Sequence, residues 1–169
     1  VESGVGRGST FTIVLPFVSV DPVCAGEEKE KQDAPDMEAL RGKRILLAED
    51  NMVNMELAVE VFSMHGIEVV QAWNGTEAVE QFAASEPFSF HFILMDMQMP
   101  ELDGCGAARQ IRAMDRPDAK SVPIIAVTAN AFAEDIAATT EAGMNVHISK
   151  PIDFDALCRV LLEQTGRVR

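Results

Sequence analysis

The sequence predicts an α/β fold in which five parallel strands form a doubly wound sheet with five helices on its two faces. Short apolar runs alternate five times with stretches of helical periodicity from residue 41 onward. The strand starts recur near residues 44, 67, 91, 122 and 145. This spacing is too short for two domains, and five units are too few for an eight-unit barrel.

Each predicted strand is a short apolar segment that is followed by a helix. The five strands are expected at residues 44–48, 67–72, 90–95, 122–127 and 146–149. The third is almost entirely apolar, which is typical of a buried central strand in a parallel sheet. The helices are expected at residues 51–65, from residue 74 onward, and at 103–115, 130–142 and 153–164.

Apolar spacing predicts which side of each helix faces the sheet. In the first helix we expect an inward stripe of Val53, Leu57, Val61 and Met64, with Gly66 ending the helix. In the second helix, Asn74 is expected to cap the N-terminus, with Glu77 at the third position. The expected inward residues of the later helices are Ala78, Val79, Phe82 and Ala83, then Ala107, Ile111 and Met114, and finally Leu157, Val160, Leu161 and Gln164. The alanine-rich fourth helix predicts light packing.

The first 40 residues differ in composition from the rest. Residues 1–17 contain a glycine-rich turn, 3–9, and then an apolar strand, 10–17. Residues 18–40 hold seven acidic and two basic residues and too few apolar ones to fold, so they are expected to be a flexible linker. We expect residues 1–40 to be mostly disordered or loosely docked, and residues 41–169 to form the folded domain.

Composition excludes several classes of protein. The formal net charge of −13 disfavours binding to a nucleic-acid backbone. No apolar run is long enough to span a bilayer and no signal peptide is visible, so direct membrane contact is not expected. The three widely spaced cysteines, Cys24, Cys105 and Cys158, argue against a disulfide framework and indicate a reducing cytoplasm.

Polar residues that could carry chemistry follow four of the predicted strands. They are Glu49 and Asp50, Asp96, Thr128, and Lys150 before Pro151. In the flavodoxin-like strand order 2-1-3-4-5 these strand ends are adjacent, and ligands of such folds bind at that edge. We therefore expect three carboxylates, a hydroxyl and an ammonium to gather at one site.

Carboxylates held so close together require a counter-charge, and Mg²⁺ prefers such oxygen ligands and commonly shares them with a phosphate. A carboxylate beside the metal, here Asp96, can attack phosphorus and form an acyl phosphate. Lys150 and Thr128 could then stabilise the phosphoryl oxygens. The alternative is that each of these residues only caps a turn or lies on the surface. The residue types would then match a phosphoryl-transfer site by coincidence at all of these strand ends.

Four stretches resemble the response-regulator receiver domain: residues 45–51, 94–104, 126–130 and 148–151. The resemblance covers about three quarters of the chain. It implies that Asp96 is the phosphoacceptor, and that Mg²⁺ is bound by Asp50, Asp96 and the backbone carbonyl of Gln98. Glu49 would act through a metal-bound water.

The same resemblance implies further roles near the phosphoryl group. Thr128 and Lys150 would contact that group, and the Lys150–Pro151 bond would be cis. His147 stands where the family usually has a Tyr, Phe or His that changes rotamer on activation, although it could instead be a surface histidine on an edge strand. His65, His91 and His147 share no spacing that would suit zinc.

Residues 1–17 resemble the last hairpin of a histidine-kinase ATP-binding domain. The resemblance implies a hybrid histidine kinase as the parent chain, although this fragment lacks the segments that would bind ATP. The expected function is to accept a phosphoryl group from a phosphohistidine of a kinase or a histidine-phosphotransfer protein. Phosphorylation would then rearrange the face formed by the fourth helix, fifth strand and fifth helix, in a monomer or weak dimer.

Other functions remain open on the sequence. One is a metal-binding interaction module that is never phosphorylated. Another is a phosphatase with an aspartyl nucleophile, although Gln98 stands where such enzymes usually have a second acid. A flavin carrier would need a phosphate-binding loop after the first strand, and none is visible. Slow self-dephosphorylation is expected, with Gln98 and Asn130 near the path of the attacking water.

Overall fold

The computed structural model describes residues 2–4, 8–10, 12, 37–129 and 133–165. The chain divides into two compact units, residues 1–34 and 35–169. In the first unit, β1 (Glu2–Gly4) and β2 (Gly8–Thr10) form a two-stranded antiparallel sheet in which Ser3 lies opposite Ser9. Most of the strand predicted at 10–17, and the linker as far as residue 36, lie outside the described residues.

The second unit contains a five-stranded parallel sheet in the order β4-β3-β5-β6-β7, which is the predicted order 2-1-3-4-5. Its strands are β3 (Arg44–Ala48), β4 (Glu68–Ala72), β5 (Phe92–Asp96), β6 (Ile124–Thr128) and β7 (Val146–Ser149). Its helices are α1 (Met52–Met64), α2 (Gly75–Ala84), α3 (Gly104–Ala113), α4 (Ala133–Glu141) and α5 (Phe154–Thr165). The predicted fold class is therefore confirmed. Residues 130–132, where α4 was expected to begin, lie outside the described part of the chain.

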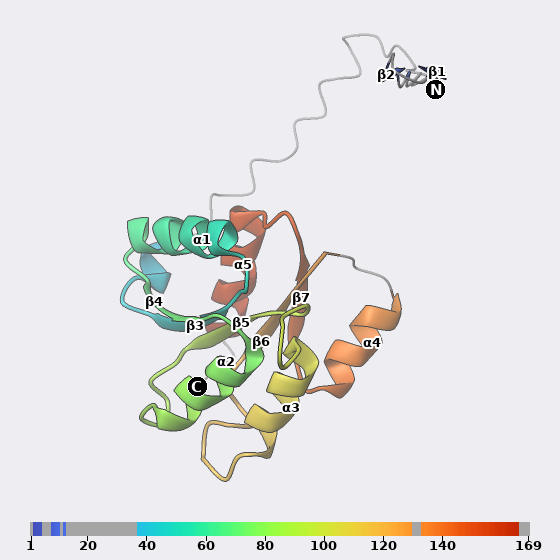
Figure 1. Cartoon of the computed structure of the whole chain (residues 1–169). Helices are drawn as coiled ribbons and strands as arrows, with labels where there is room; N and C mark the ends of the chain where they lie inside the picture. The colour runs from blue at the N-terminus through green and yellow to red at the C-terminus, as the bar shows by residue number, and fades with distance from the viewer. Residues whose placement is uncertain (1, 5–7, 11, 13–36, 130–132, 166–169) are drawn as a thin grey trace. The chain divides into compact units, whose positions relative to one another are not determined.

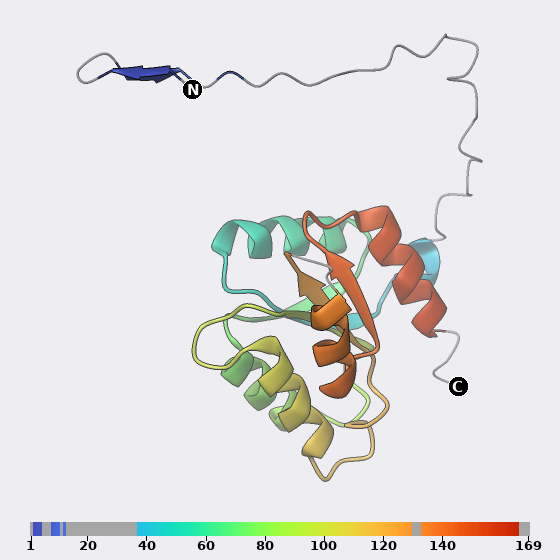
Figure 2. The same cartoon turned by 90° about the vertical axis from the view of Figure 1, so that its right-hand side faces the viewer.

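The helices cover both faces of the sheet. Helices α1 and α5 lie on one face and α2, α3 and α4 on the other (Figure 1 and Figure 2). Successive side chains of a strand point to opposite faces, so Ile45 packs with one layer and Leu46 with the other. Strand β5 is buried along its whole length, as its apolar sequence predicts. The sheet thus lies between two hydrophobic cores.

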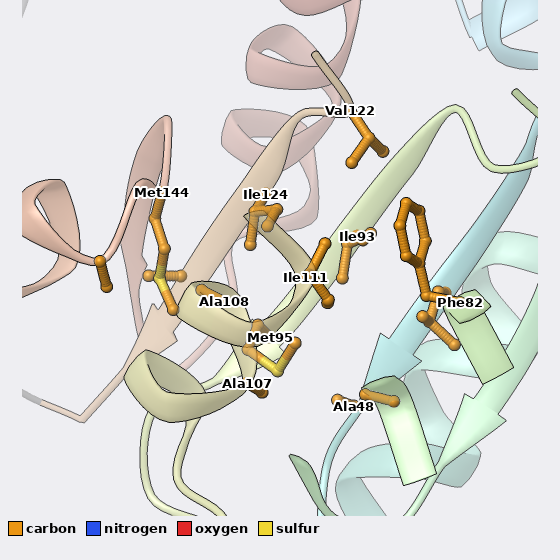
Figure 3. Packing of buried hydrophobic residues seen from close by; sticks show 14 of the residues in the cluster. Ala48, Phe82, Ile93, Met95, Ala107, Ala108, Ile111, Val122, Ile124 and Met144 are labelled. Carbon is orange, nitrogen blue, oxygen red and sulfur yellow. The ribbon is translucent and has the colours of Figure 1, made fainter. Parts of the chain in front are cut away.

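The core beneath α2 and α3 combines small and large apolar residues. Figure 3 shows Ile111 of α3 lying against Ile93 of β5, with Phe82 of α2 beside them. Ala107 and Ala108 bring α3 close to the sheet, and both are fully buried. Residues 97–103 connect the end of β5 to the start of α3, and the small side chains of Ala107 and Ala108 let that helix pack closely on the sheet.

The inward stripe predicted for α1 is wrong. Val53, Leu57 and Met64 are 68%, 54% and 78% exposed. The buried residues of α1 are Met55, Ala58 and Phe62. Because α1 is apolar around most of its circumference, two stripes satisfy the helical spacing. The larger Phe62 decides between them by packing edge-on against Phe154 of α5, with 5.9 Å between the ring centroids.

The predicted cap of α2 and the predicted end of α1 are confirmed, and Asn51 is a further cap that was not predicted. Asn51 caps α1, and Gly66 follows its last turn with a φ of 71°. At α2, Asn74 Oδ1 accepts the N–H of Glu77 at 2.8 Å, while Glu77 Oε2 accepts the N–H of Trp73 at 2.8 Å. The predicted inward residues Ala78 and Phe82 of α2 are buried. Ala83 is exposed, contrary to the prediction, because it follows the buried Phe82 and lies about 100° further around the helix.

The folded unit begins earlier than predicted. Residues Met37–Leu40, assigned to the linker on their charge, form a short 3-10 helix, η2. Leu40 is fully buried in the core beneath α1 and α5. Leu40 follows a charged run and is not part of a periodic apolar pattern, so the sequence did not indicate that it belongs to the core.

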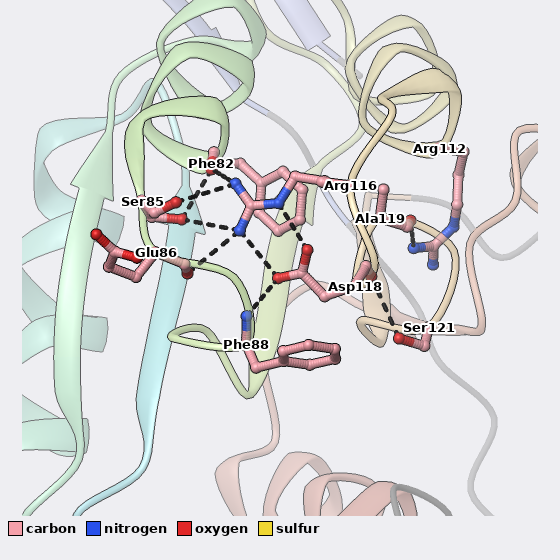
Figure 4. A network of polar contacts seen from close by, with 9 residues as sticks. All are labelled: Phe82, Ser85, Glu86, Phe88, Arg112, Arg116, Asp118, Ala119 and Ser121. Carbon is pink, nitrogen blue, oxygen red and sulfur yellow. Dashed lines mark hydrogen bonds and ion pairs between the residues drawn. The ribbon is translucent and has the colours of Figure 1, made fainter.

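A buried ion pair joins two loops at the edge of the sheet remote from the strands' carboxyl ends (Figure 4). Arg116 Nε lies 2.6 Å from Asp118 Oδ1, and their side chains are 10% and 2% exposed. Arg116 also donates to the carbonyls of Phe82 and Ser85 at the end of α2. Asp118 Oδ2 accepts the N–H of Phe88 at 2.7 Å. This network, which sequence reasoning did not predict, attaches the loop after α2 to the loop after α3.

Candidate functional site

Three of the predicted site residues meet at the carboxyl edge of the sheet. Lys150 Nζ donates to Glu49 Oε2 at 2.7 Å and to Asp96 Oδ2 at 2.6 Å. The side chains of Glu49 and Asp96 are 5% and 6% exposed, and that of Lys150 is 24% exposed. One ammonium therefore serves two buried carboxylates that come from different strands.

The sheet places these groups through its parallel strands. Asp96 is the last residue of β5, and Glu49 follows the last residue of the adjacent β3. Lys150 follows β7, and its backbone N–H donates to the carbonyl of Thr128 at 2.7 Å. The peptide bond from Lys150 to Pro151 is cis, as the resemblance implies. Parallel strands end at one edge, so residues far apart in the sequence meet there.

A third carboxylate completes an acidic cluster. Ligand atoms of Glu49, Asp50 and Asp96 all lie within 4.8 Å of one another, and Asp50 is exposed while the other two are buried. Three carboxylates beside one ammonium leave a net negative charge of two when all are ionised. Hard oxygen atoms, a compact arrangement and that charge fit a divalent cation such as Mg²⁺.

Burial and the hydrogen bonds of Lys150 together determine the pKa values of Asp96 and Lys150. Burial raises the pKa of Asp96 above its ordinary value, and the hydrogen bond from Lys150 only partly opposes this. Burial by itself would lower the pKa of Lys150, but its hydrogen bonds to Asp96 and Glu49 outweigh that effect and raise it. Lys150 is consequently charged at neutral pH, and Asp96 depends on that charge for its ionised form.

Glu49 has two further partners that sequence reasoning did not predict. Its Oε1 accepts the backbone N–H of Asn51 at 3.3 Å and the side-chain amide of Asn54 at 2.9 Å. Asn54 is the third residue of α1, in its first turn. A second asparagine three residues after Asn51 and close after the acidic pair was the only available signal for it, and that signal was weak.

The remaining predicted residues lie around the same edge. The backbone N–H of Gln98 donates to Asp96 Oδ1 at 3.2 Å, while the role of its carbonyl stays a prediction. Thr128 ends β6 and is buried. His147 is half-buried on the edge strand β7, where it lies opposite Ala126. Asn130 falls outside the described residues.

The other histidines and cysteines form no second site within the described ranges. His91 Nδ1 accepts the backbone N–H of Arg44 at 3.2 Å, so it serves as a strand-end acceptor. Burial, with the nearby charge of Lys43, lowers the pKa of His91. Cys105 and Cys158 are buried in different cores. No helix of the described residues is long and apolar enough to cross a membrane.

A family model described as the response regulator receiver domain matches residues 45–162. Two-component system protein A of Emericella nidulans is 38% identical over 163 residues, which are 95% of this chain and 22% of that protein. The chain spans less than a quarter of the length of the first curated relatives that it matches.

Solved structures show the same fold. The receiver domain of sensor histidine kinase PA1611 from Pseudomonas aeruginosa, which has a magnesium ion in its active-site cleft, is 38% identical with a TM-score of 0.67. The match covers 74% of this chain and 98% of that one. The receiver domain of Ssk1 from Saccharomyces cerevisiae, solved with the histidine phosphotransfer protein Ypd1, is 29% identical with a TM-score of 0.65, covering 74% and 90%.

Proposed function

The chain belongs to the response regulator receiver family of two-component signalling, and on that premise we propose that Asp96 accepts a phosphoryl group from a phosphohistidine. The observation that supports the proposal most is the contact of buried Asp96 with Lys150, beside two more carboxylates. A turn cap or surface charge would not be held in this way by a group from another strand. A metal-binding module without phosphorylation is the alternative.

The transfer moves one phosphoryl group between two side chains. An oxygen of ionised Asp96 attacks phosphorus, a P–O bond forms, and the P–N bond to the donor imidazole breaks with its electron pair returning to nitrogen. Lys150, already 2.6 Å from Asp96, stabilises the negative charge of the phosphoryl oxygens. The hydroxyl of Thr128 donates to one of those oxygens.

Glu49, Asp50 and Asp96 would hold Mg²⁺ together with the backbone carbonyl of Gln98. When bound, Mg²⁺ supplies positive charge to the phosphoryl oxygens and to the carboxylates around them. The magnesium ion in the similar PA1611 receiver supports this choice of metal. Glu49, held by Lys150 and by the start of α1, would act on the metal through a bound water.

Phosphorylation then changes a two-state equilibrium of the domain. Thr128 moves toward the phosphoryl oxygens, His147 follows, and the face formed by α4, β7 and α5 is rearranged. Thr128 lies opposite Ser149 in the sheet, which brings the end of β6 next to the end of β7. A movement of Thr128 at the end of β6 can therefore reach Ser149, and through it His147, which lies two residues earlier on β7.

The donor is a phosphohistidine domain of a kinase or a histidine-phosphotransfer protein. The complex of the similar Ssk1 receiver with Ypd1 supports this kind of partner. The parent chain is a hybrid histidine kinase, with residues 1–17 ending its ATP-binding domain and the acidic segment from residue 18 serving as a linker. We propose a monomer or weak dimer that works in the cytoplasm, as its cysteines indicate.

The experiment that tests this function is an NMR titration with Mg²⁺ and then with beryllofluoride, which mimics a phosphoryl group. The wild-type chain and Asp96→Asn are compared. We expect shifts at Asp50, Asp96 and Lys150 that spread to α4 and that the variant lacks. Mg²⁺ binding without a response to beryllofluoride would favour the metal-binding module and overturn the phosphoacceptor proposal.

The acyl phosphate is also expected to hydrolyse slowly by itself. Gln98 lies two residues after Asp96 and is exposed, so its side chain can meet an approaching water. Asn130 is the second proposed contact on that path. The lifetime of the phosphorylated form in Gln98→Ala and Asn130→Ala tests both roles, and a lifetime unchanged from the wild type would exclude them.

A further inference from the structure

The two carboxylate oxygens of Glu49 have different partners. Oε2 contacts Lys150 at 2.7 Å and so faces the acidic cluster. Oε1 faces the start of α1, where the backbone N–H of Asn51 lies at 3.3 Å and Asn54 Nδ2 at 2.9 Å. The side chain is 5% exposed, so these protein groups take the place of bulk water. The shorter bond on the helix side is the one from Asn54.

Asn54 is itself held in place by the helix cap. Asn51 Oδ1 accepts the N–H of Val53 at 3.0 Å and that of Asn54 at 3.2 Å. The side-chain amide of Asn54 must present its nitrogen to Glu49, since an ionised carboxylate only accepts hydrogen bonds. The capped start of α1 therefore positions the side-chain amide of Asn54, and this amide positions the carboxylate of Glu49.

We propose that Asn54 is a positioning residue of the phosphoacceptor site. Its side-chain amide holds Glu49 Oε1, keeps Oε2 directed toward Asp96 and Lys150, and thereby raises the affinity of the acidic cluster for Mg²⁺. This inference rests on the proposed function, because it concerns the metal that the phosphoryl transfer requires. Groups that orient metal ligands typically change metal affinity by about 10- to 100-fold when removed.

A role in stability alone predicts a different outcome. Alanine is a better helix former than asparagine inside a helix, and the Asn54 side chain is exposed at the surface of α1. Replacing Asn54 by Ala gains helix propensity but removes one hydrogen bond from the buried Glu49, so the melting temperature of the chain should change only slightly. A much lower affinity for Mg²⁺ with only a slight change in the melting temperature is the signature of positioning.

The test measures Mg²⁺ binding by calorimetry on the full chain. We expect Asn54→Ala to raise the dissociation constant about tenfold. Val53→Ala is the matched control, since Val53 lies on the same helix turn, is 68% exposed and has no side-chain group that can bond to Glu49. It should bind Mg²⁺ within about twofold of the wild type, which is a small effect on the scale of such orienting groups.

A double-mutant cycle with Glu49→Ala shows whether Asn54 acts through Glu49. If it does, Asn54→Ala has no further effect once the carboxylate is removed. A wild-type affinity in Asn54→Ala, or a loss that persists without Glu49, overturns this inference and leaves the phosphoacceptor proposal intact. Failure of the wild-type chain to bind Mg²⁺ would overturn the proposed function and this inference together.

Discussion

Lys150 Nζ and Asp96 Oδ2 lie 2.6 Å apart although the two residues are 54 positions apart in the sequence. The contact joins the residue after the edge strand β7 to the last residue of the central strand β5. Glu49 shares the same ammonium. Lys150 is thus the counter-charge for both carboxylates, so its removal should change the stability of the chain and the pH dependence of that stability.

Lys150→Met keeps the length of the side chain and removes its charge. Glu49 and Asp96 then lie buried without a counter-charge, and we expect the free energy of unfolding at pH 7 to fall by about 3 kcal/mol. Burial raises the pKa of Asp96, and protonation of this carboxyl relieves the repulsion, so the difference from the wild type should shrink as the pH falls toward about 4. Urea denaturation without Mg²⁺ at both pH values measures this, with exposed Lys120→Met as the control. An equal loss at both pH values would contradict the prediction.

Gly104→Ala should disturb Asp96, the proposed phosphoacceptor, through its backbone. A Cβ at Gly104 would lie 2.3 Å from the carbonyl oxygen of Asp96. This oxygen belongs to the backbone of the central strand β5, so it cannot move away without distorting the sheet. We expect a loss of about 1–3 kcal/mol in unfolding free energy together with weaker beryllofluoride binding.

Gly106→Ala is the comparison for that variant. Its Cβ would meet Leu102 Cδ1 at 2.6 Å, the end of a side chain that can rotate away. It should cost less stability and leave the response to beryllofluoride intact. If both variants behave alike, then the contact of Gly104 with the backbone of Asp96 does not position the site.

Asp118→Asn tests the buried pair with Arg116. Although burial alone would raise the pKa of Asp118, the hydrogen bonds and charge of Arg116 lower it below the ordinary value. Its stabilisation is therefore complete above the ordinary carboxyl pKa and is lost as the pH falls through the lowered one. We expect the variant to be about 3 kcal/mol less stable at pH 7, because Arg116 stays buried without its partner.

The pH dependence separates this charge effect from lost packing. The difference between the wild type and Asp118→Asn should narrow as the pH falls from about 4 toward 2, because the wild-type carboxyl is then protonated as well. Guanidinium denaturation of both chains over that range gives the comparison. A difference that stays constant with pH would show that the carboxylate charge is not what stabilises the loop.

Substitutions in α1 test which stripe faces the core. Phe62→Ala removes a buried ring that packs against Phe154, and we expect a loss of about 3–5 kcal/mol. Leu57→Ala alters a side chain that is 54% exposed, and its cost should stay below about 1 kcal/mol. Thermal unfolding of the two variants measures both losses of stability. A loss in Leu57→Ala as large as that in Phe62→Ala would show that the predicted stripe, which includes Leu57, faces the core after all.

The sequence predicted the strands well, the buried faces of the helices less well, and the polar contacts between loops not at all. Strands β3 and β7 match their predicted bounds, and β5 and β6 begin two residues later than predicted. Phe90 and Val122, at those predicted starts, are buried without belonging to a strand, and an apolar pattern does not distinguish the two cases. The site residues that end or follow strands were predictable because parallel strands end at one edge.

Local pattern was sufficient wherever the determinant lies within a few residues, as with the Asn74 cap, the Gly66 helix end and the alternation of strand and helix. The tertiary structure alone decided contacts that depend on distant partners. Phe154 selects the buried face of α1, Lys150 joins Glu49 to Asp96, and Arg116 reaches the end of α2. The physical reason is that propensity and capping act along the chain, whereas packing and the pairing of buried charges act through space, between residues that only the folded sheet brings together.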